Sequence, residues 1–133
     1  MTTEEWYNSI TKRIINCAIE VHKELGPGLM ESVYDICLRK TLLREGLKFK
    51  SQVVVPVCFK EELLDKIFVI DLLVEDAIIV ELKAIEFVLP IHEAQLVTYL
   101  KLADKRLGLL INFKVVLLKD GIRRRINGKL NSV

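Results

Sequence analysis

The first quarter of the chain carries hydrophobic residues at helical spacing. Between Thr3 and Leu25 they recur every three or four positions, at Ile10, Ile14, Cys17 or Ala18, Val21 and Leu25. This spacing predicts an amphipathic helix from about Thr3 to Leu25. Gly26-Pro27-Gly28 follows and supplies a C-terminal glycine and a proline that cannot continue a helix, so we expect the helix to end there.

A second helix is predicted from about Leu29 to Arg44, and Gly46 closes it. Its inward positions are expected to be Val33, Cys37 and either Leu38 or Thr41-Leu42. Glu31 falls in its first turn, where the helix dipole favours a carboxylate without any function.

The middle of the chain has the pattern of β-strands. Gln52 to Phe59 is rich in valine, and Pro56 within it favours an edge position or a bulge. After a turn at Lys60-Glu61-Glu62, two apolar segments, Leu63 to Val74 and Ala77 to Ala84, predict a hairpin. Strands that are apolar on both faces are normally central in a sheet and covered on both sides.

The last third of the chain returns to a helix and then to strands. Pro90 suits the first turn of a helix that we expect over Ile91 to Leu102. Arg106 to Phe113 predicts a buried strand, and shorter strands are expected at Val115 to Leu118 and at Ile122 to Ile126. The predicted fold is therefore α/β, with one mixed β-sheet flanked by helices.

Chain length and composition place these elements in one domain. At 133 residues, 51% hydrophobic and 29% charged, the chain suits a single domain over residues 1–133, in which residues 127–133 are expected to form a frayed tail. No apolar run approaches the roughly 20 residues of a membrane span, so no membrane partner is expected. Cys17, Cys37 and Cys58 lie far apart within apolar patterns, which favours reduced core cysteines in a cytoplasmic protein.

The formal net charge of +2 conceals an asymmetry along the chain. Residues 101–133 carry nine Lys or Arg against Asp104 and Asp120, which makes this segment +7 and leaves −5 for residues 1–100. A basic segment beside a centre rich in carboxylates suits a polyanionic substrate that needs a metal. A solvated basic tail is the simpler interpretation.

Three charged residues interrupt the apolar hairpin: Asp71 in its first strand, and Glu81 and Lys83 in its second. Buried charge is costly unless it is paired or binds a metal. One interpretation is a metal site with an attendant lysine. The other is an ion pair between Lys83 and a carboxylate at a strand end.

The turn of the hairpin distinguishes these interpretations. A strict two-residue turn at Glu75-Asp76 would place Asp71 and Glu81 on opposite sides of the sheet. A three-residue loop that also includes Ala77, or a bulge of one residue, places Asp71 opposite Glu81 and Lys83 on the same face. We predict this second register. Two such carboxylates suit Mg²⁺, which can activate a water for phosphodiester hydrolysis.

Several blocks of the sequence resemble a known family. G-P-G-L-M-E-S-V-Y, from Gly26 to Tyr34, resembles the signature of the GxxExxY family, with Gly28, Glu31 and Tyr34 as its named positions. The resemblance covers most of the chain, from Ile10 to Ile126, through these further blocks: I-E-V-H-K-E-L, D-L-L-V-E-D, I-V-E-L-K-A, H-E-A-Q-L-V-T-Y-L-K and L-G-L-L-I-N-F. That family is placed in the PD-(D/E)XK nuclease superfamily, which implies a restriction-endonuclease-like fold.

The resemblance also implies a site. Asp71 would be the motif aspartate, Glu81 and Lys83 the E-x-K, and Gln95 with Tyr99 the Q-x-x-x-Y that positions substrate or water. The implied metal ligands are Glu31, Asp71, Glu81 and the carbonyl of Leu82, for Mg²⁺ or Mn²⁺. His22, His92 and Tyr34 are expected to be structural.

The expected function is a metal-dependent nuclease that hydrolyses phosphodiester bonds of nucleic acid, with DNA as the first candidate. The alternative is a non-catalytic nucleic-acid-binding or assembly protein that retains the nuclease fold. Because the chain has no separate recognition domain, it would use a partner, form a homodimer, or read the shape of the nucleic acid.

Overall fold

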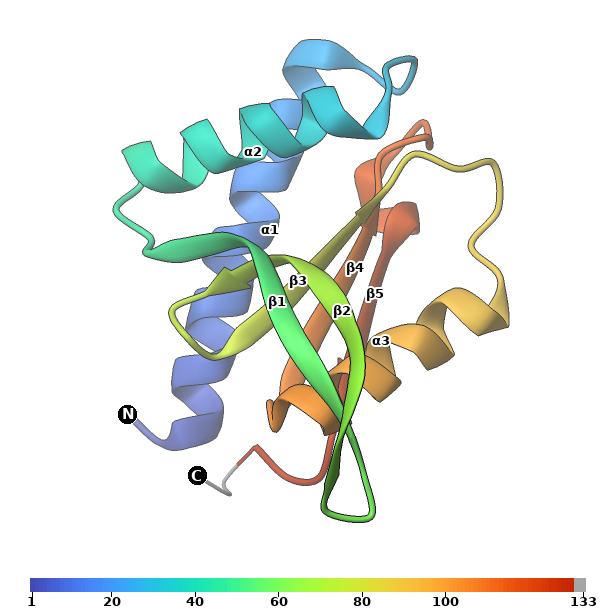
Figure 1. Cartoon of the computed structure of the whole chain (residues 1–133). Coiled ribbons are helices and arrows are strands. Elements are labelled where there is room, and N and C mark those ends of the chain that lie inside the picture. Colours follow the sequence, from blue (N-terminus) through green and yellow to red (C-terminus); the bar gives the residue numbers. More distant parts are fainter. Residues whose placement is uncertain (131–133) are drawn as a thin grey trace.

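The computed structural model describes residues 1–130, and within them five strands form one mixed sheet with helices on both faces (Figure 1). The elements in chain order are α1 (Thr3–Leu25), α2 (Glu31–Arg44), β1 (Phe49–Phe59), β2 (Glu62–Val74), β3 (Ile78–Lys83), α3 (Pro90–Ala103), β4 (Leu107–Asn112), the 3-10 helix η1 (Leu118–Gly121) and β5 (Ile122–Ile126). The predicted fold class, an α/β mixed sheet flanked by helices, is confirmed.

The strands lie in the order β1-β2-β3-β4-β5. β3 and β4 are parallel and are connected through α3, whereas every other neighbouring pair is antiparallel. β4 lies in the interior of the sheet, and all six of its residues are buried, as its apolar sequence predicted. The carboxyl ends of β3 and β4 therefore lie side by side, with Lys83 opposite Asn112.

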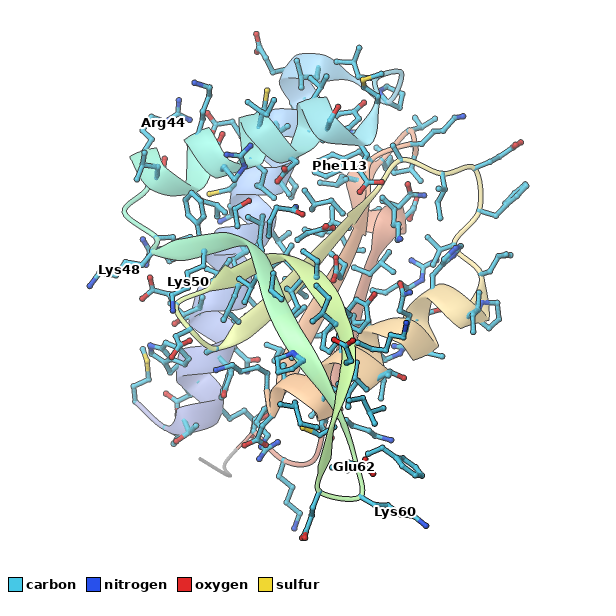
Figure 2. All side chains as sticks on the ribbon, viewed as in Figure 1. Arg44, Lys48, Lys50, Lys60, Glu62 and Phe113 are labelled. Atoms are coloured by element: carbon cyan, nitrogen blue, oxygen red, sulfur yellow. The ribbon has the colours of Figure 1, made fainter. Side chains whose placement is uncertain are left out.

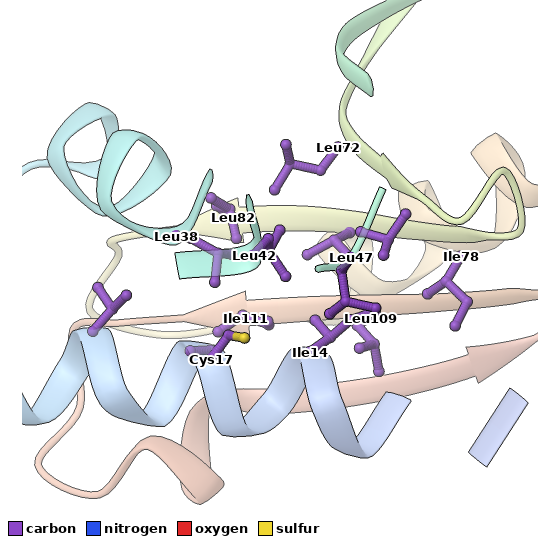
Figure 3. Close-up of a cluster of buried hydrophobic side chains, with 14 of the residues drawn as sticks. Ile14, Cys17, Leu38, Leu42, Leu47, Leu72, Ile78, Leu82, Leu109 and Ile111 are labelled. Carbon is purple, nitrogen blue, oxygen red and sulfur yellow. The ribbon is translucent and has the colours of Figure 1, made fainter. Parts of the chain in front are cut away.

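The hydrophobic core has two parts, one on each face of the sheet. On the larger side α1 and α2 pack against the sheet, and Figure 3 shows their side chains meeting those of the strands. The residues labelled there are Ile14, Cys17, Leu38, Leu42, Leu47, Leu72, Ile78, Leu82, Leu109 and Ile111. On the other face Leu96 and Leu100 of α3 cover Ile70, Leu73 and Ile79.

The first helix has the predicted bounds, with Thr2 Oγ1 accepting from the Glu5 N–H at 3.1 Å and Gly26 at a positive φ of 73°. The second helix begins later than predicted, at Glu31. Its inward face was also partly misassigned: Val33 and Cys37 are only half-buried, and the buried residues are Tyr34, Leu38, Thr41 and Leu42. The aromatic ring of Tyr34 takes the inward position that we assigned to its smaller neighbour.

β1 is an edge strand, and its register with β2 shifts between Pro56 and Cys58, as the proline predicted. The β1–β2 hairpin extends beyond the rest of the sheet. Figure 2 shows Lys60 and Glu62 at its tip and Phe113 toward the opposite end of the molecule, near α2.

Three expectations from the sequence need correction. Val115 to Leu118 form no strand, because β4 pairs directly with β5 and the connection between them is an irregular loop that ends in η1. Cys58 is free but exposed, since it lies on the hairpin that extends beyond the sheet. The expected fraying does not begin at residue 127, because the Asn127 N–H donates to the Arg106 carbonyl at 2.8 Å and Leu130 is buried. Residues 131–133 lie outside the described part.

Within residues 1–130, none of the helices has both the length and the apolar character that crossing a membrane requires.

A close approach of two backbone segments makes Gly121 indispensable. An added Cβ would lie 2.1 Å from the Asn112 carbonyl oxygen, whereas a Cβ at Gly28 would meet nothing within 4 Å. We expect Gly121→Ala to lower the free energy of unfolding by about 2 kcal/mol or more, and Gly28→Ala by less than about 0.5 kcal/mol. Urea unfolding of both variants measures the difference. Equal stabilities would show that the β4–η1 contact is looser than described.

Candidate active site

A three-residue loop closes the β2–β3 hairpin. Val74 pairs with Ile78, and Glu75 and Asp76 occupy the left-handed region with φ of 53° and 55°. The same register continued places Asp71 opposite Glu81, so the predicted register is confirmed.

The two carboxylates join the strands where the ladder of backbone bonds ends. The last paired residues are Leu72 and Val80. Beyond them the Leu82 N–H donates to Asp71 Oδ2 at 2.9 Å, and the Asp71 N–H approaches Glu81 Oε2 at 3.4 Å. Each carboxylate is thus held by the backbone of the facing strand.

The β1–β2 ribbon twists at the same point, so that its side chains pack against one core on one side of Asp71 and against the other core on the other side. Gln52, opposite Asp71 in the register, has a φ of 53°. On one side of it the pair Phe49 and Val74 packs into the α1–α2 core, and on the other side the pair Val53 and Ile70 packs under α3. Asp71 therefore lies where the ribbon crosses from one face of the sheet to the other, beside both layers of helices.

Glu81 is more buried than Asp71. Its side chain is 8% exposed, and its Oε1 has no hydrogen-bond partner within residues 1–130. Burial raises its pKa to about 9, contact with Asp71 adds to the shift, and the charge of Lys83 partly opposes it. Without a cation, the Glu81 carboxyl therefore holds a proton at neutral pH.

Glu31 lines the same cavity as Asp71. The cavity measures about 370 Å³ and is lined by Glu31, Ser32, Asp35, Gln52, Asp71 and Leu82. Partial burial, followed by the charge of Asp71, raises the pKa of Glu31, and the charge of Lys83 lowers it. In the described part of the chain, no three His, Cys, Asp or Glu side chains are close enough together to hold a metal ion. Asp71 contacts Glu81 and also lines the cavity that Glu31 lines, whereas Glu81 is not among the lining residues.

Tyr34 fixes the loop that leads into Glu31. Its hydroxyl donates to the Gly26 carbonyl and accepts from the Leu29 N–H at 3.1 Å. Its ring stacks on Phe113 with centroids 4.4 Å apart. Tyr34 is therefore a packing residue, as predicted. In the G-x-x-E-x-x-Y spacing, the tyrosine in the first turn of α2 anchors the loop that precedes the helix.

Lys83 lies on the same face as Glu81, two residues further along β3. It is half-buried and forms no salt bridge within the described residues, so the simple ion-pair interpretation finds no support there. Its charge partly opposes the effect of burial, which raises the pKa of both Glu31 and Glu81.

The two predicted residues of α3 differ in their placement. Tyr99 is half-buried, stacks on Phe68 at 4.4 Å, and has its pKa raised by burial and by the charges of Glu81 and Asp71. Gln95, one turn earlier, is exposed and forms no side-chain hydrogen bond in residues 1–130. Tyr99 is therefore the residue of the two whose pKa responds to the charges of Asp71 and Glu81.

Both histidines have structural roles, as expected. His22 Nε2 donates to the Val115 carbonyl at 2.8 Å, and His92 Nδ1 accepts from the Leu89 N–H at 2.9 Å.

Asn112 is a residue that sequence reasoning missed. It is 1% exposed, and its amide holds the backbone of Ile85 through two hydrogen bonds, 3.0 Å to the N–H and 2.8 Å to the carbonyl. Because it pairs with Lys83 across the sheet, it fixes the chain just after the lysine. The signal was present, since a polar residue ends an otherwise apolar strand, L-G-L-L-I-N.

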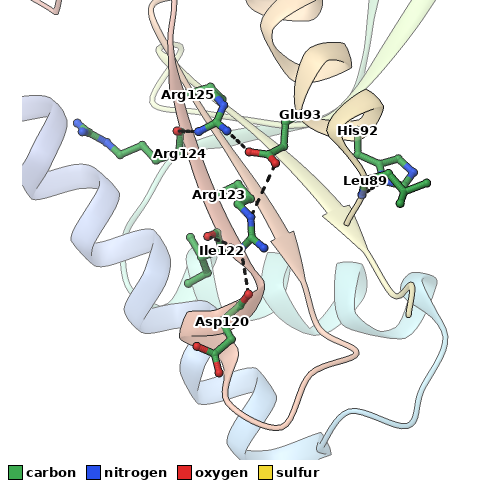
Figure 4. Close-up of polar contacts among 8 residues, drawn as sticks. All are labelled: Leu89, His92, Glu93, Asp120, Ile122, Arg123, Arg124 and Arg125. Atoms are coloured by element: carbon green, nitrogen blue, oxygen red, sulfur yellow. Dashed lines mark hydrogen bonds and ion pairs between the residues drawn. The ribbon is translucent and has the colours of Figure 1, made fainter. Parts of the chain in front are cut away.

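Part of the basic C-terminal segment is already paired within the protein. Arg123 and Arg125 contact Glu93 of α3 (Figure 4). Arg124 donates to Asn8 Oδ1 at 2.8 Å. These arginines are therefore less available to a polyanion than their number in the sequence indicates.

Comparison with known proteins agrees with the fold. The PD-(D/E)XK nuclease superfamily matches residues 8–125, and the chain belongs to this superfamily. Members of the superfamily typically depend on a metal. No curated protein and no solved structure matches the chain significantly.

The raised pKa of Glu81 gives a pH-dependent stability. Between pH 4.5 and about 9 the folded protein keeps a proton that the unfolded chain releases, so this group lowers the free energy of unfolding as pH rises. In EDTA, we expect the free energy of unfolding of Glu81→Gln to rise relative to that of wild type by about 2–4 kcal/mol between pH 5 and pH 8. The slope of this difference is about 1.4 kcal/mol per pH unit at most. Urea unfolding at several pH values measures this gain.

The control for that experiment is Glu62→Gln at the hairpin tip, which should reproduce the wild-type curve. Adding Mg²⁺ at pH 8 should stabilise wild type and leave Glu81→Gln nearly unchanged. Parallel pH curves for wild type and Glu81→Gln would show that Glu81 is ionised in the metal-free protein.

Proposed function

We propose that the protein is a metal-dependent nuclease that hydrolyses phosphodiester bonds of nucleic acid, with DNA as the first candidate substrate. The observation that carries the proposal is the pairing of Asp71 and Glu81 across β2 and β3, with Lys83 on the same face. Membership of the PD-(D/E)XK nuclease superfamily supports it. The resemblance to the GxxExxY family, through Gly28, Glu31 and Tyr34, adds the helix-borne carboxylate.

The residues present fit a divalent cation. Two adjacent carboxylates, one of them buried with an unpaired oxygen, are hard oxygen ligands that gain from a nearby positive charge. We infer that Asp71 and Glu81 hold Mg²⁺ or Mn²⁺, and that Glu31 and the Leu82 carbonyl supply further ligands. When bound, such a cation lowers the pKa of a water and polarises a phosphoryl oxygen.

Lys83 and α3 have separate tasks in this proposal. Lys83 donates a hydrogen bond to the attacking water and offsets the negative charge that develops on the phosphate. Tyr99, beside the carboxylates, positions the water or a phosphate oxygen through its hydroxyl. Gln95 contacts the substrate from the exposed surface of the same helix.

The decisive experiment is a cleavage assay on single-stranded, duplex and branched DNA and on RNA, with Mg²⁺ or Mn²⁺. We expect Lys83→Ala and Asp71→Ala to lose at least about 100-fold in rate, because each removes a group that stabilises charge in the transition state. Circular dichroism and thermal unfolding establish that the variants fold. Lys60→Ala, which removes an exposed lysine at the tip of the β1–β2 hairpin, outside the catalytic groups, should cleave at about the wild-type rate.

Equal cleavage by wild type, Lys83→Ala and Asp71→Ala would identify a contaminating nuclease and reject the proposal. Absence of cleavage on every substrate, together with absence of Mg²⁺ and Mn²⁺ binding by calorimetry, would favour a non-catalytic nucleic-acid-binding or assembly protein that retains the fold.

A further inference from the structure

The loop between β3 and α3 presents a phenylalanine to solvent close to the site. Phe87 is 71% exposed and follows Lys83 by four residues, so the two Cα atoms are within about 14 Å. The loop projects from the sheet in Figure 1, as the yellow-to-gold segment between β3 and α3. A large exposed aromatic on a loop beside a catalytic site points to binding rather than to packing.

Both ends of this loop are fixed by side chains. Near its start, the buried amide of Asn112 holds the N–H and the carbonyl of Ile85. Near its end, His92 Nδ1 accepts from the Leu89 N–H. Phe87 therefore projects from a segment anchored on either side, which reduces the conformational entropy that a ligand must offset on binding.

The neighbouring loop, which follows β4, supplies a positive charge. The Lys114 N–H donates to Asn112 Oδ1 at 3.3 Å, and the next residue, Val115, is held through its carbonyl by His22. Lys114 itself is exposed. One buried amide thus joins two anchored loops, one with an exposed aromatic ring and the other with an exposed ammonium group.

We propose that Phe87 and Lys114 form a subsite for one unpaired nucleotide, with the base stacked on the Phe87 ring and a backbone phosphate beside Lys114. An aromatic ring with an adjacent cation is the combination that binds single-stranded nucleic acid without reading its sequence. The bases of an intact duplex are already stacked and do not reach such a ring. The inference rests on the proposed function and specifies its substrate class: single-stranded nucleic acid, or a duplex with an unpaired nucleotide next to the bond that is cleaved.

The test measures binding and not cleavage. Fluorescence anisotropy with a labelled 15-nucleotide poly(dT) and a blunt duplex, in EDTA, compares wild type with Phe87→Ala. We expect affinity for the single strand to fall about 5- to 150-fold and affinity for the duplex to change less than about twofold. Phe59→Ala is the matched control, because Phe59 is similarly exposed, at 59%, and has the Lys60 ammonium 5.5 Å from its ring centroid, but belongs to the β1–β2 hairpin and not to the loops after β3 and β4. Figure 2 shows Lys60 at the tip of that hairpin.

Two further variants test the geometry of the subsite. Phe87→Trp should retain the affinity, and its emission should be quenched by the oligonucleotide beyond that of wild type, which contains Trp6. Lys114→Ala should weaken single-strand binding and reduce the slope of log K against log salt by about 0.7, whereas Lys60→Ala should not.

The outcomes separate this inference from the nuclease proposal. Equal single-strand affinities for Phe87→Ala and Phe59→Ala would overturn the subsite, even if cleavage depends on Lys83. Binding that depends on Phe87, in a protein that cleaves nothing, would support the subsite and reject the nuclease. A wild-type dimer in size-exclusion chromatography that Phe87→Ala dissociates would identify the loop as a contact between copies and overturn the subsite.

Discussion

Two carboxylates share one side of the β2–β3 hairpin because a three-residue loop closes it. With one residue fewer in the loop, Asp71 and Glu81 would point to opposite faces, and Lys83 would lie apart from the aspartate. The positive φ of Glu75 and Asp76, which non-glycine residues seldom adopt, makes this register possible. The Lys48 N–H donates to Glu75 Oε2 at 2.6 Å, and the Glu75 N–H donates to the Lys48 carbonyl at 2.8 Å. These two bonds tie the turn to the chain just before β1.

Burying Glu81 against Asp71 is costly for folding, and no group within residues 1–130 fully offsets that cost. Lys83 lowers the pKa of Glu81, yet burial and Asp71 outweigh it and keep that pKa near 9. A structural ion pair would place an ammonium group in contact with the carboxylate. A site for a cation has the opposite requirement, namely an acidic pocket that is destabilising until it is filled. The unpaired Oε1 of Glu81 fits the second description.

Sequence alone predicted the features that depend on local patterns. Helical spacing and Gly26 predicted the bounds of α1. The possible lengths of the turn after Val74 reduced the hairpin register to a choice between two, and the predicted one is confirmed. Features that depend on tertiary contacts were out of reach. The residues around Val115 have high β-strand propensity, but the Val115 carbonyl accepts a hydrogen bond from His22 of α1 instead of pairing with a strand. The place of Glu31 on the cavity that Asp71 also lines likewise follows from how α2 docks on the sheet.

Asn112 holds the two loops that follow β3 and β4, next to Lys83. It is buried at the end of a strand whose other residues are apolar, and its amide is satisfied by backbone groups of two loops, at Ile85 and Lys114. The same amide therefore limits the movement of the chain after Lys83 and of the chain after β4. Rigid loops at the carboxyl ends of β3 and β4 would keep a bound strand in one position relative to the carboxylates. For hydrolysis at a single bond, that positioning matters as much as the acidic pair itself.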